Sequence, residues 1–219
     1  MLSRIAIYLV GFFITGAGVV LLIRTEHAGP WDAVSANFSA FISHFLWEGF
    51  TVGMGSFTVN VTIMLSVTLL RKRPRFLFML VPILGISASI DIWNEFLLAG
   101  VLEDLEIIGV ALLFLFGTVV LTFGLSTIVM SGFPAMVFEE LMLLIMDAFN
   151  IRSIFAVRLG LELFAITLAS IFGFAAGEGF GVVGVGSLVL AFIIAPILAY
   201  QMHWMKGVIY ERTSDKSHH

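Results

Sequence analysis

Six long apolar stretches fill most of this sequence, and they constrain its fold more than any other feature does. A helix needs about 20 residues to cross the ~30 Å hydrocarbon core of a bilayer. Stretches of that length lie at 4–24, 50–70, 76–99, 106–130, 152–175 and 180–205. The chain is 60% hydrophobic and 12% charged, so a single soluble core cannot bury its apolar surface. We therefore predict an all-α polytopic membrane protein, with residues 1–219 forming one integral membrane domain of six transmembrane helices.

Two shorter apolar segments, 30–47 and 134–150, begin with a proline and are interrupted by polar residues. Proline suits the first turn of a helix, where its missing N–H costs nothing, so each segment is predicted to form a short helix. Such a helix either enters the protein part-way through the membrane, with its N-terminal N–H groups inside, or lies flat at the surface. We favour the re-entrant alternative and leave the interfacial one open.

Basic residues sort to one side of the membrane if these two segments do not span it. That side receives nine of the eleven basic residues, namely Arg4, Arg71, Lys72, Arg73, Arg75, Arg152, Lys206, Arg212 and Lys216. The opposite side receives Arg24 alone, and Arg158 falls within a span. The positive-inside rule then places both termini in the cytoplasm, with residues 206–219 as a cytoplasmic tail.

The two halves of the chain follow the same order of features. Pro30 and Pro134, 104 positions apart, each follow a glycine-containing break after a long span, and two further spans follow each short segment. We predict that residues 1–100 and 105–205 are two related repeats. Because three spans is an odd number, the second repeat must be inverted in the membrane relative to the first.

The motifs at these breaks resemble those of the YitT/YczE family of bacterial inner-membrane proteins. The first-half signature is carried by Ala28-Gly29-Pro30-Trp31-Asp32-Ala33, and the later pattern by Gly132-Phe133-Pro134, Arg158-x3-Glu162 and the glycine run 177–186. The sequence departs from the family at Glu178, which interrupts a common Gly-Gly pair, and at Ser187, where threonine is frequent. The resemblance implies an uncharacterised transporter or permease and supports topology more than substrate.

Arg158 and Glu162 are a charged pair within a predicted span. At a spacing of four residues they share one face of the helix, and charges at membrane depth usually face a bundle interior or an aqueous cavity. A functional interpretation makes Glu162 a proton or cation site, or Arg158 an anchor for an anion. The alternative is a mutually neutralised pair that fixes helix packing, and the sequence leaves both open.

Residues close to the two prolines complete the predicted pathway. Asp32 lies two positions after Pro30, where it can cap the short helix, the role we favour, while also lying close to a central pathway. Glu139 and Glu140 point about 100° apart on the second short helix, so one of them can face a pathway, with solvation at the surface as the alternative. The predicted pathway residues are Pro30, Asp32, Pro134, Glu139, Arg158 and Glu162.

Two further polar or small-residue clusters have simpler interpretations. Asp91, Asn94 and Glu95 lie close together near the outer end of the third span, where a polar helix end is favoured over a vestibule that attracts cations. The glycines of 177–186 predict close helix approach or a locally unwound segment. Their match to a dinucleotide fingerprint is formal only, because the run opens a membrane span.

These features predict passage of a small solute or ion across the bacterial inner membrane by a transporter or permease. The alternative is a membrane-embedded accessory or regulatory protein that binds a partner and transports nothing. The common enzyme motifs do not occur in the sequence, so we expect neither an enzyme nor a cofactor or metal site. The net charge of −4 argues against nucleic acid as a partner, whereas lipid is required and a homo-oligomer is left open.

Overall fold

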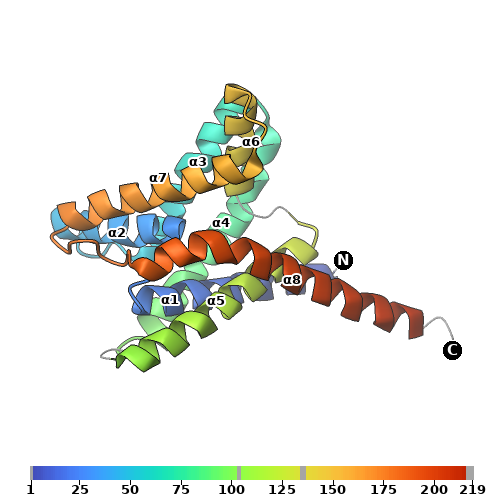
Figure 1. Ribbon diagram of the computed structural model, residues 1–219, viewed down its shortest axis with the longest axis horizontal. Coiled ribbons are helices and arrows are strands. Elements are labelled where there is room, and N and C mark those ends of the chain that lie inside the picture. The colour runs from blue at the N-terminus through green and yellow to red at the C-terminus, as the bar shows by residue number, and fades with distance from the viewer. Residues whose placement is uncertain (1, 103–104, 134–136, 216–219) are drawn as a thin grey trace.

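The protein is all-helical in a computed structural model that describes residues 2–102, 105–133 and 137–215 (Figure 1). Within those ranges it has eight α-helices, one 3₁₀ helix and one π-helix. In chain order they are α1 (Leu2–Arg24), α2 (Pro30–Phe45), α3 (Val52–Arg71), the 3₁₀ helix η1 (Pro74–Met79), α4 (Leu80–Asp91), the π-helix η2 (Ile92–Leu97), α5 (Ile107–Met130), α6 (Val137–Phe149), α7 (Ile154–Ala175) and α8 (Val185–Asp215).

Six segments of the described chain are long and apolar enough to cross a membrane. They are Arg4–Arg24, Val52–Arg71, Pro74–Leu97, Ile107–Met130, Ile154–Ala175 and Val185–Met205. This confirms a multi-pass membrane protein with six candidate spans, as predicted. The two short segments form α2, with 16 residues, and α6, with 13 residues, and both fall below the length that a spanning helix needs.

Two spans differ from their predicted form. The third is composite, because η1, α4 and η2 follow one another without a break in the helical path. The sixth begins at Val185 rather than at 180, and α8 continues to Asp215 through much of the predicted tail. Pro30 occupies the first turn of α2 as predicted, whereas Pro134 lies outside the described residues.

The packing of α1 against α5 forms the centre of the molecule, and small residues bring the two helices together. A Cβ atom on Gly18 would collide with the backbone of Leu121, and one on Gly124 would lie 2.5 Å from the amide nitrogen of Thr15. Van der Waals contact between close backbones is the main source of helix association in lipid. Around this pair, α4 packs on α1 and α8 packs on α5.

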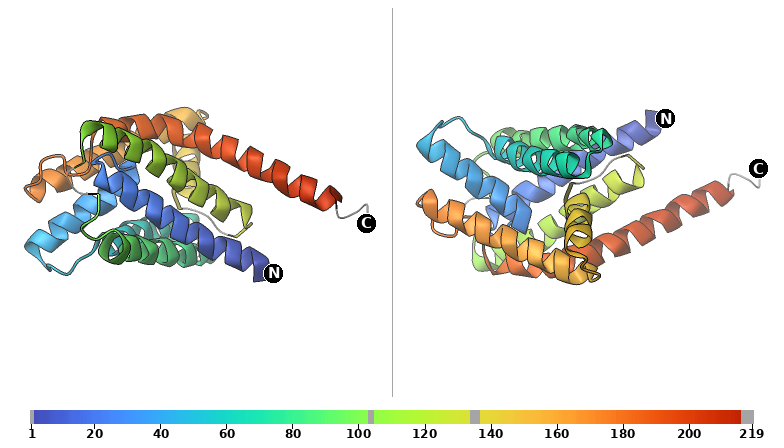
Figure 2. Two further views of the ribbon diagram at one scale, coloured as in Figure 1. Left: turned by 90° about the horizontal axis from the view of Figure 1, so that it is seen from below. Right: turned by 90° about the horizontal axis from the view of Figure 1, so that it is seen from above.

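Each of the two short helices packs on one helix of its own half of the chain and on one helix of the opposite half. α2 lies between α3 and α7, and α6 contacts α3 and α7. The contact of α6 with α3 includes an ion pair between Arg71 and Asp147 at 2.7 Å. Both chain termini lie at one end of the molecule, and the far ends of α2 and α7 lie at the other (Figures 1 and 2).

A glycine-rich loop joins α7 to α8 and is held by a side chain of α2. Gly177, Gly179 and Gly181 have positive φ angles, a conformation that favours glycine. The buried Asn37 amide donates from Nδ2 to the carbonyls of Ala169 and Phe180, both at 2.9 Å, and its Oδ1 accepts from the Val182 amide at 3.1 Å. The structure therefore confirms an unwound segment in the glycine run 177–186, and hydrogen bonds from Asn37 connect it to α2.

Candidate functional site

A cavity of about 140 Å³ lies where α2 and α6 begin. All eight α-helices of the described chain, or the residues just before them, contribute to its wall. It is lined by Thr15, Val19, Gly29, Pro30, Trp31, Asp32, Ser56, Asn60, Pro82, Ile83, Ile86, Leu121, Leu125, Val137, Phe138, Glu139, Arg158, Glu162, Ile194 and Leu198. We call it the central cavity. Most of its wall is apolar, and its ionisable groups are three carboxylates and one guanidinium.

The structure brings together five of the six residues predicted to line a pathway. Pro30 and Asp32 come from the first turn of α2, Glu139 from the first turn of α6, and Arg158 and Glu162 from α7. Pro134, the sixth, lies outside the described residues. The packing of α2 on α7 is what places residues so distant in the chain around a single space.

Arg158 and Glu162 form a long, single contact. The distance from Arg158 Nε to Glu162 Oε1 is 3.9 Å, and the two side chains are 39% and 14% exposed. The Arg158 Nε atom is buried, and the described residues offer it no hydrogen-bond partner. A strong structural ion pair would be bidentate at about 2.7–2.9 Å. The observed contact therefore holds the two side chains only weakly and leaves the guanidinium able to bind another group.

The prediction that Asp32 caps α2 is wrong. It lies in the first turn of α2, but no side-chain hydrogen bond caps this helix within the described chain, so the favoured capping role is not observed. The carboxylate instead lies close enough to Glu162 for the two to interact electrostatically. Pro30 needs no cap of its own because it has no N–H group.

Glu139 joins the same group of charges from the other short helix. Its carboxylate interacts electrostatically with the guanidinium of Arg158 and with the carboxylate of Glu162. Glu140, its neighbour, does not line the central cavity and faces a different one. Of the two adjacent carboxylates, Glu139 is therefore the one that lines the central cavity, and its place in a pathway stays a prediction.

Sequence reasoning missed the neutral polar residues of the wall. Ser56 and Asn60 lie one turn apart on α3, and Asn60 Nδ2 donates to the Ser56 carbonyl at 2.8 Å. An asparagine inside an apolar span was the available signal, because polar groups at membrane depth are costly unless they serve a purpose.

The polar residues at the end of the third span have specific structural partners. Asp91 accepts hydrogen bonds from the Gly53 amide at 2.7 Å and from the Thr51 hydroxyl at 2.8 Å, which stabilises the N-terminus of α3. Asn94 Oδ1 accepts from Arg24 at 3.2 Å. These contacts accord with the favoured interpretation of a polar helix end and give it a definite role.

These features define a class, an all-helical multi-pass membrane protein with six candidate spans around a small charged cavity. Within that class, the chain belongs to a family of unknown function, DUF6198, whose model matches residues 2–203. Neither a curated protein nor a solved structure matches the chain.

Proposed function

We propose that this protein is a transporter or permease that carries a small solute or ion through the central cavity. The observation that carries the proposal is the meeting of Asp32, Glu139, Arg158 and Glu162 in one cavity that is lined by residues of all eight α-helices of the described chain. Ionisable groups are expensive at membrane depth, and those found there commonly mark a pathway for an ion, a proton or a substrate.

The charges of the cavity favour a cation or a proton as the carried or coupled species. Three carboxylates face one guanidinium, and the only ion pair among them is the 3.9 Å contact of Arg158 with Glu162. The ionised site therefore has two negative charges in excess, in a space where charge is poorly solvated. A bound cation or protons on the carboxylates would neutralise this excess, whereas an anion would increase it.

We further propose that the two halves are inverted repeats and that α2 and α6 are re-entrant. Matching pairs of contacts support this: α2 packs on α7 as α6 packs on α3, and α1 packs on α4 as α5 packs on α8. In transporters built from inverted repeats, substrates bind at the repeat interface near the starts of half-helices. The first turns of α2 and α6 both border the central cavity.

We propose a bacterial inner-membrane location with both termini in the cytoplasm, and kinship with the YitT/YczE proteins on the motifs that resemble theirs. The split of basic residues supports this orientation. Cysteine accessibility from outside intact cells tests it at two exposed positions, Lys72 and Glu48. Labelling of a cysteine at Glu48 and protection of one at Lys72 is the expected result, and the reverse pattern would refute the topology.

The transport proposal is tested in proteoliposomes with a pH-sensitive dye inside. We expect the wild type to exchange protons for at least one of four external cations: ammonium, methylammonium, Na⁺ or K⁺. Glu162→Gln keeps the shape of the side chain and removes its charge, so proton exchange should be lost while the protein still folds. Glu178→Gln removes the same charge from an exposed loop position and is the matched control.

The accessory-protein alternative predicts a different result in the same experiment. A protein that only binds a partner would move none of the four cations at any proton gradient. In that case Glu162→Gln should alter stability alone, by about 3–5 kcal/mol if the pair with Arg158 is structural.

A further inference from the structure

Each of the two short helices places an aromatic residue next to an acidic one in the wall of the central cavity. In the first turn of α2 these are Trp31 and Asp32, and in the first turn of α6 they are Phe138 and Glu139. The two rings stack on each other, with their centres 4.8 Å apart and their planes inclined by 29°. Stacking takes up one face of each ring, and both rings still border the cavity.

The rest of the wall suits an organic cation better than a metal ion. An alkali ion gives up its hydration water where a shell of oxygen atoms replaces it, and the aliphatic side chains of Val19, Ile83 and Leu121 cannot supply one. Among the described residues, no group of three acidic or histidine side chains could hold a metal ion. The methyl groups of an organic cation, by contrast, pack favourably against aliphatic side chains.

An alkylammonium ion matches the aromatic and acidic residues as well. The face of an aromatic ring attracts a cation within about 6 Å of its centre, most strongly for tryptophan and where water is excluded. Arg158 is ion-paired with Glu162. The other two carboxylates of the cavity, those of Asp32 and Glu139, are left to balance the charge of the ion. The cavity of about 140 Å³ is smaller than the range of about 300–1,000 Å³ found for drug-sized ligands, so the ion must be small.

From these contacts we infer that the central cavity binds a small alkylammonium ion, such as tetramethylammonium, in preference to Na⁺ or K⁺. This preference rests on the proposed transport function and specifies the class of cation that the same site takes. The carboxylates of Asp32 and Glu139 balance the charge of the bound ion, and its methyl groups contact the rings of Trp31 and Phe138. Aromatic cages recognise quaternary ammonium groups in the same way.

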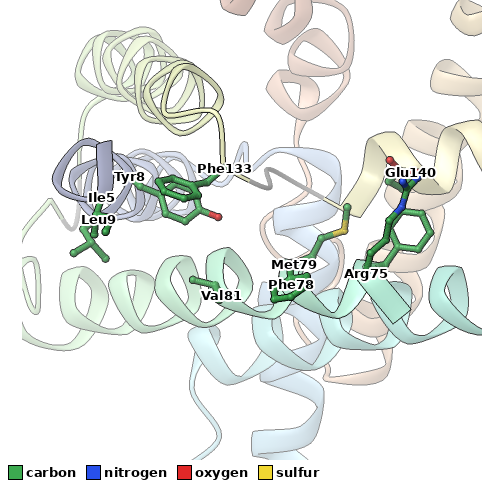
Figure 3. A pocket seen from close by; sticks show the side chains of 10 residues that line it. Ile5, Tyr8, Leu9, Arg75, Phe78, Met79, Val81, Phe133 and Glu140 are labelled. Carbon is green, nitrogen blue, oxygen red and sulfur yellow. The ribbon is translucent and has the colours of Figure 1, made fainter. Parts of the chain in front are cut away.

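A second aromatic pair in the structure provides a matched control. Tyr8 and Phe133, whose ring centres are 5.1 Å apart, line a separate lateral cavity between α1 and the start of the third span (Figure 3). The charged residues on its described wall are Arg75 and Glu140, which lie close together at the opposite end from this pair. Because these two charges cancel, the described wall has no excess of negative charge, and we expect this cavity to bind no cation.

Calorimetric titration of the purified chain in an uncharged detergent measures the preference. We expect the wild type to bind tetramethylammonium about tenfold or more tightly than Na⁺ or K⁺. Phe138→Leu removes a ring but keeps an apolar side chain, and should weaken the binding of tetramethylammonium by about fivefold or more. Phe138→Tyr keeps the ring and should restore most of that binding. Phe133→Leu removes a ring from the lateral cavity and should bind as the wild type does.

Equal affinities of the wild type for tetramethylammonium and K⁺ would overturn the preference, and this comparison needs no variant. Undiminished binding by Phe138→Leu, or an equal loss in Phe133→Leu, would overturn the role of the ring in the central cavity. The proteoliposome assay separates these outcomes from transport. If Na⁺ or K⁺ exchanges for protons and tetramethylammonium neither binds nor competes, the preference is refuted and transport stands. If tetramethylammonium binds and no cation moves, the preference stands and transport is refuted.

Discussion

Asn37 offers the sharpest test of how this fold holds its site together. It lies on α2 at 1% exposure and joins that helix to α7 and to the loop before α8 through three hydrogen bonds. Asp32 lies earlier on the same helix, and Glu162 lies earlier on α7, so this junction sets how the two carboxylates approach. Replacing Asn37 by leucine keeps a side chain of similar size and removes all three hydrogen bonds.

The expected loss of stability follows from the hydrogen bonds that each partner of Asn37 loses. Side-chain hydrogen bonds measured in a membrane protein average about 0.6 kcal/mol, so three such bonds contribute about 2 kcal/mol. The Phe180 carbonyl keeps a hydrogen bond from the Val183 amide at 3.2 Å, which limits its loss. The Val182 amide donates to Asn37, and leaving it without an acceptor adds about 1–2 kcal/mol. We therefore expect Asn37→Leu to lower the free energy of unfolding by about 3–4 kcal/mol.

Unfolding by SDS in mixed micelles, followed by the fluorescence of the four tryptophans, measures this change. Asn60→Leu is the matched control, because the amide of Asn60 bonds within its own helix to the Ser56 carbonyl and should cost less than about 1 kcal/mol when removed. If Asn37→Leu destabilises the protein no more than Asn60→Leu does, the loop is held by something other than Asn37 and the reasoning fails.

Three other substitutions, one of them with its own control, test the packing and the helix ends by the same unfolding measurement. Gly124→Leu should prevent folding or cost several kcal/mol, since even a Cβ atom there meets the backbone of α1. The control, Gly160→Leu, should be tolerated, because nothing lies within 4 Å of a Cβ atom at that position. Equal effects of the two substitutions would contradict the α1–α5 contact. Asp91→Ala should cost about 1–2 kcal/mol by removing the acceptor of the Gly53 amide in the first turn of α3, and a neutral result would count against that contribution. Arg71→Gln should cost less than about 1 kcal/mol, because its partner Asp147 is 67% exposed, and a larger loss would mean that this ion pair holds α6 on α3.

The spans illustrate how far periodicity and composition reach. Each run of about 20 apolar residues has few alternatives to a spanning helix, because lipid offers no partners for unpaired backbone groups. That local rule predicted all six candidate spans, whereas the prolines predicted both short helices. It could not predict that the third span passes through 3₁₀, α and π geometry, since the preference among these helices depends on the neighbours against which the side chains pack.

The charged residues illustrate what the sequence could predict only in part. The spacing of Arg158 and Glu162 placed them on one face of a helix, and Pro30 marked where α2 begins. Their shared role in a pathway stays a prediction that transport measurements must test. Asp32 was expected to cap α2 and does not; the proline at the start of this helix has no N–H group and leaves one donor fewer to satisfy.

The sequence by itself therefore determined that the chain is a membrane protein, how many helices are long and apolar enough to span, and where two short helices lie between them, because each of these depends on the solvation of one segment by lipid. Only the tertiary structure decided that Asp32, Glu139, Arg158 and Glu162 surround one cavity and that Asn37 fastens a loop more than 130 positions away. Such contacts arise from the packing of α2 on α7. Their energies depend on distances and burial that no local pattern of residues contains.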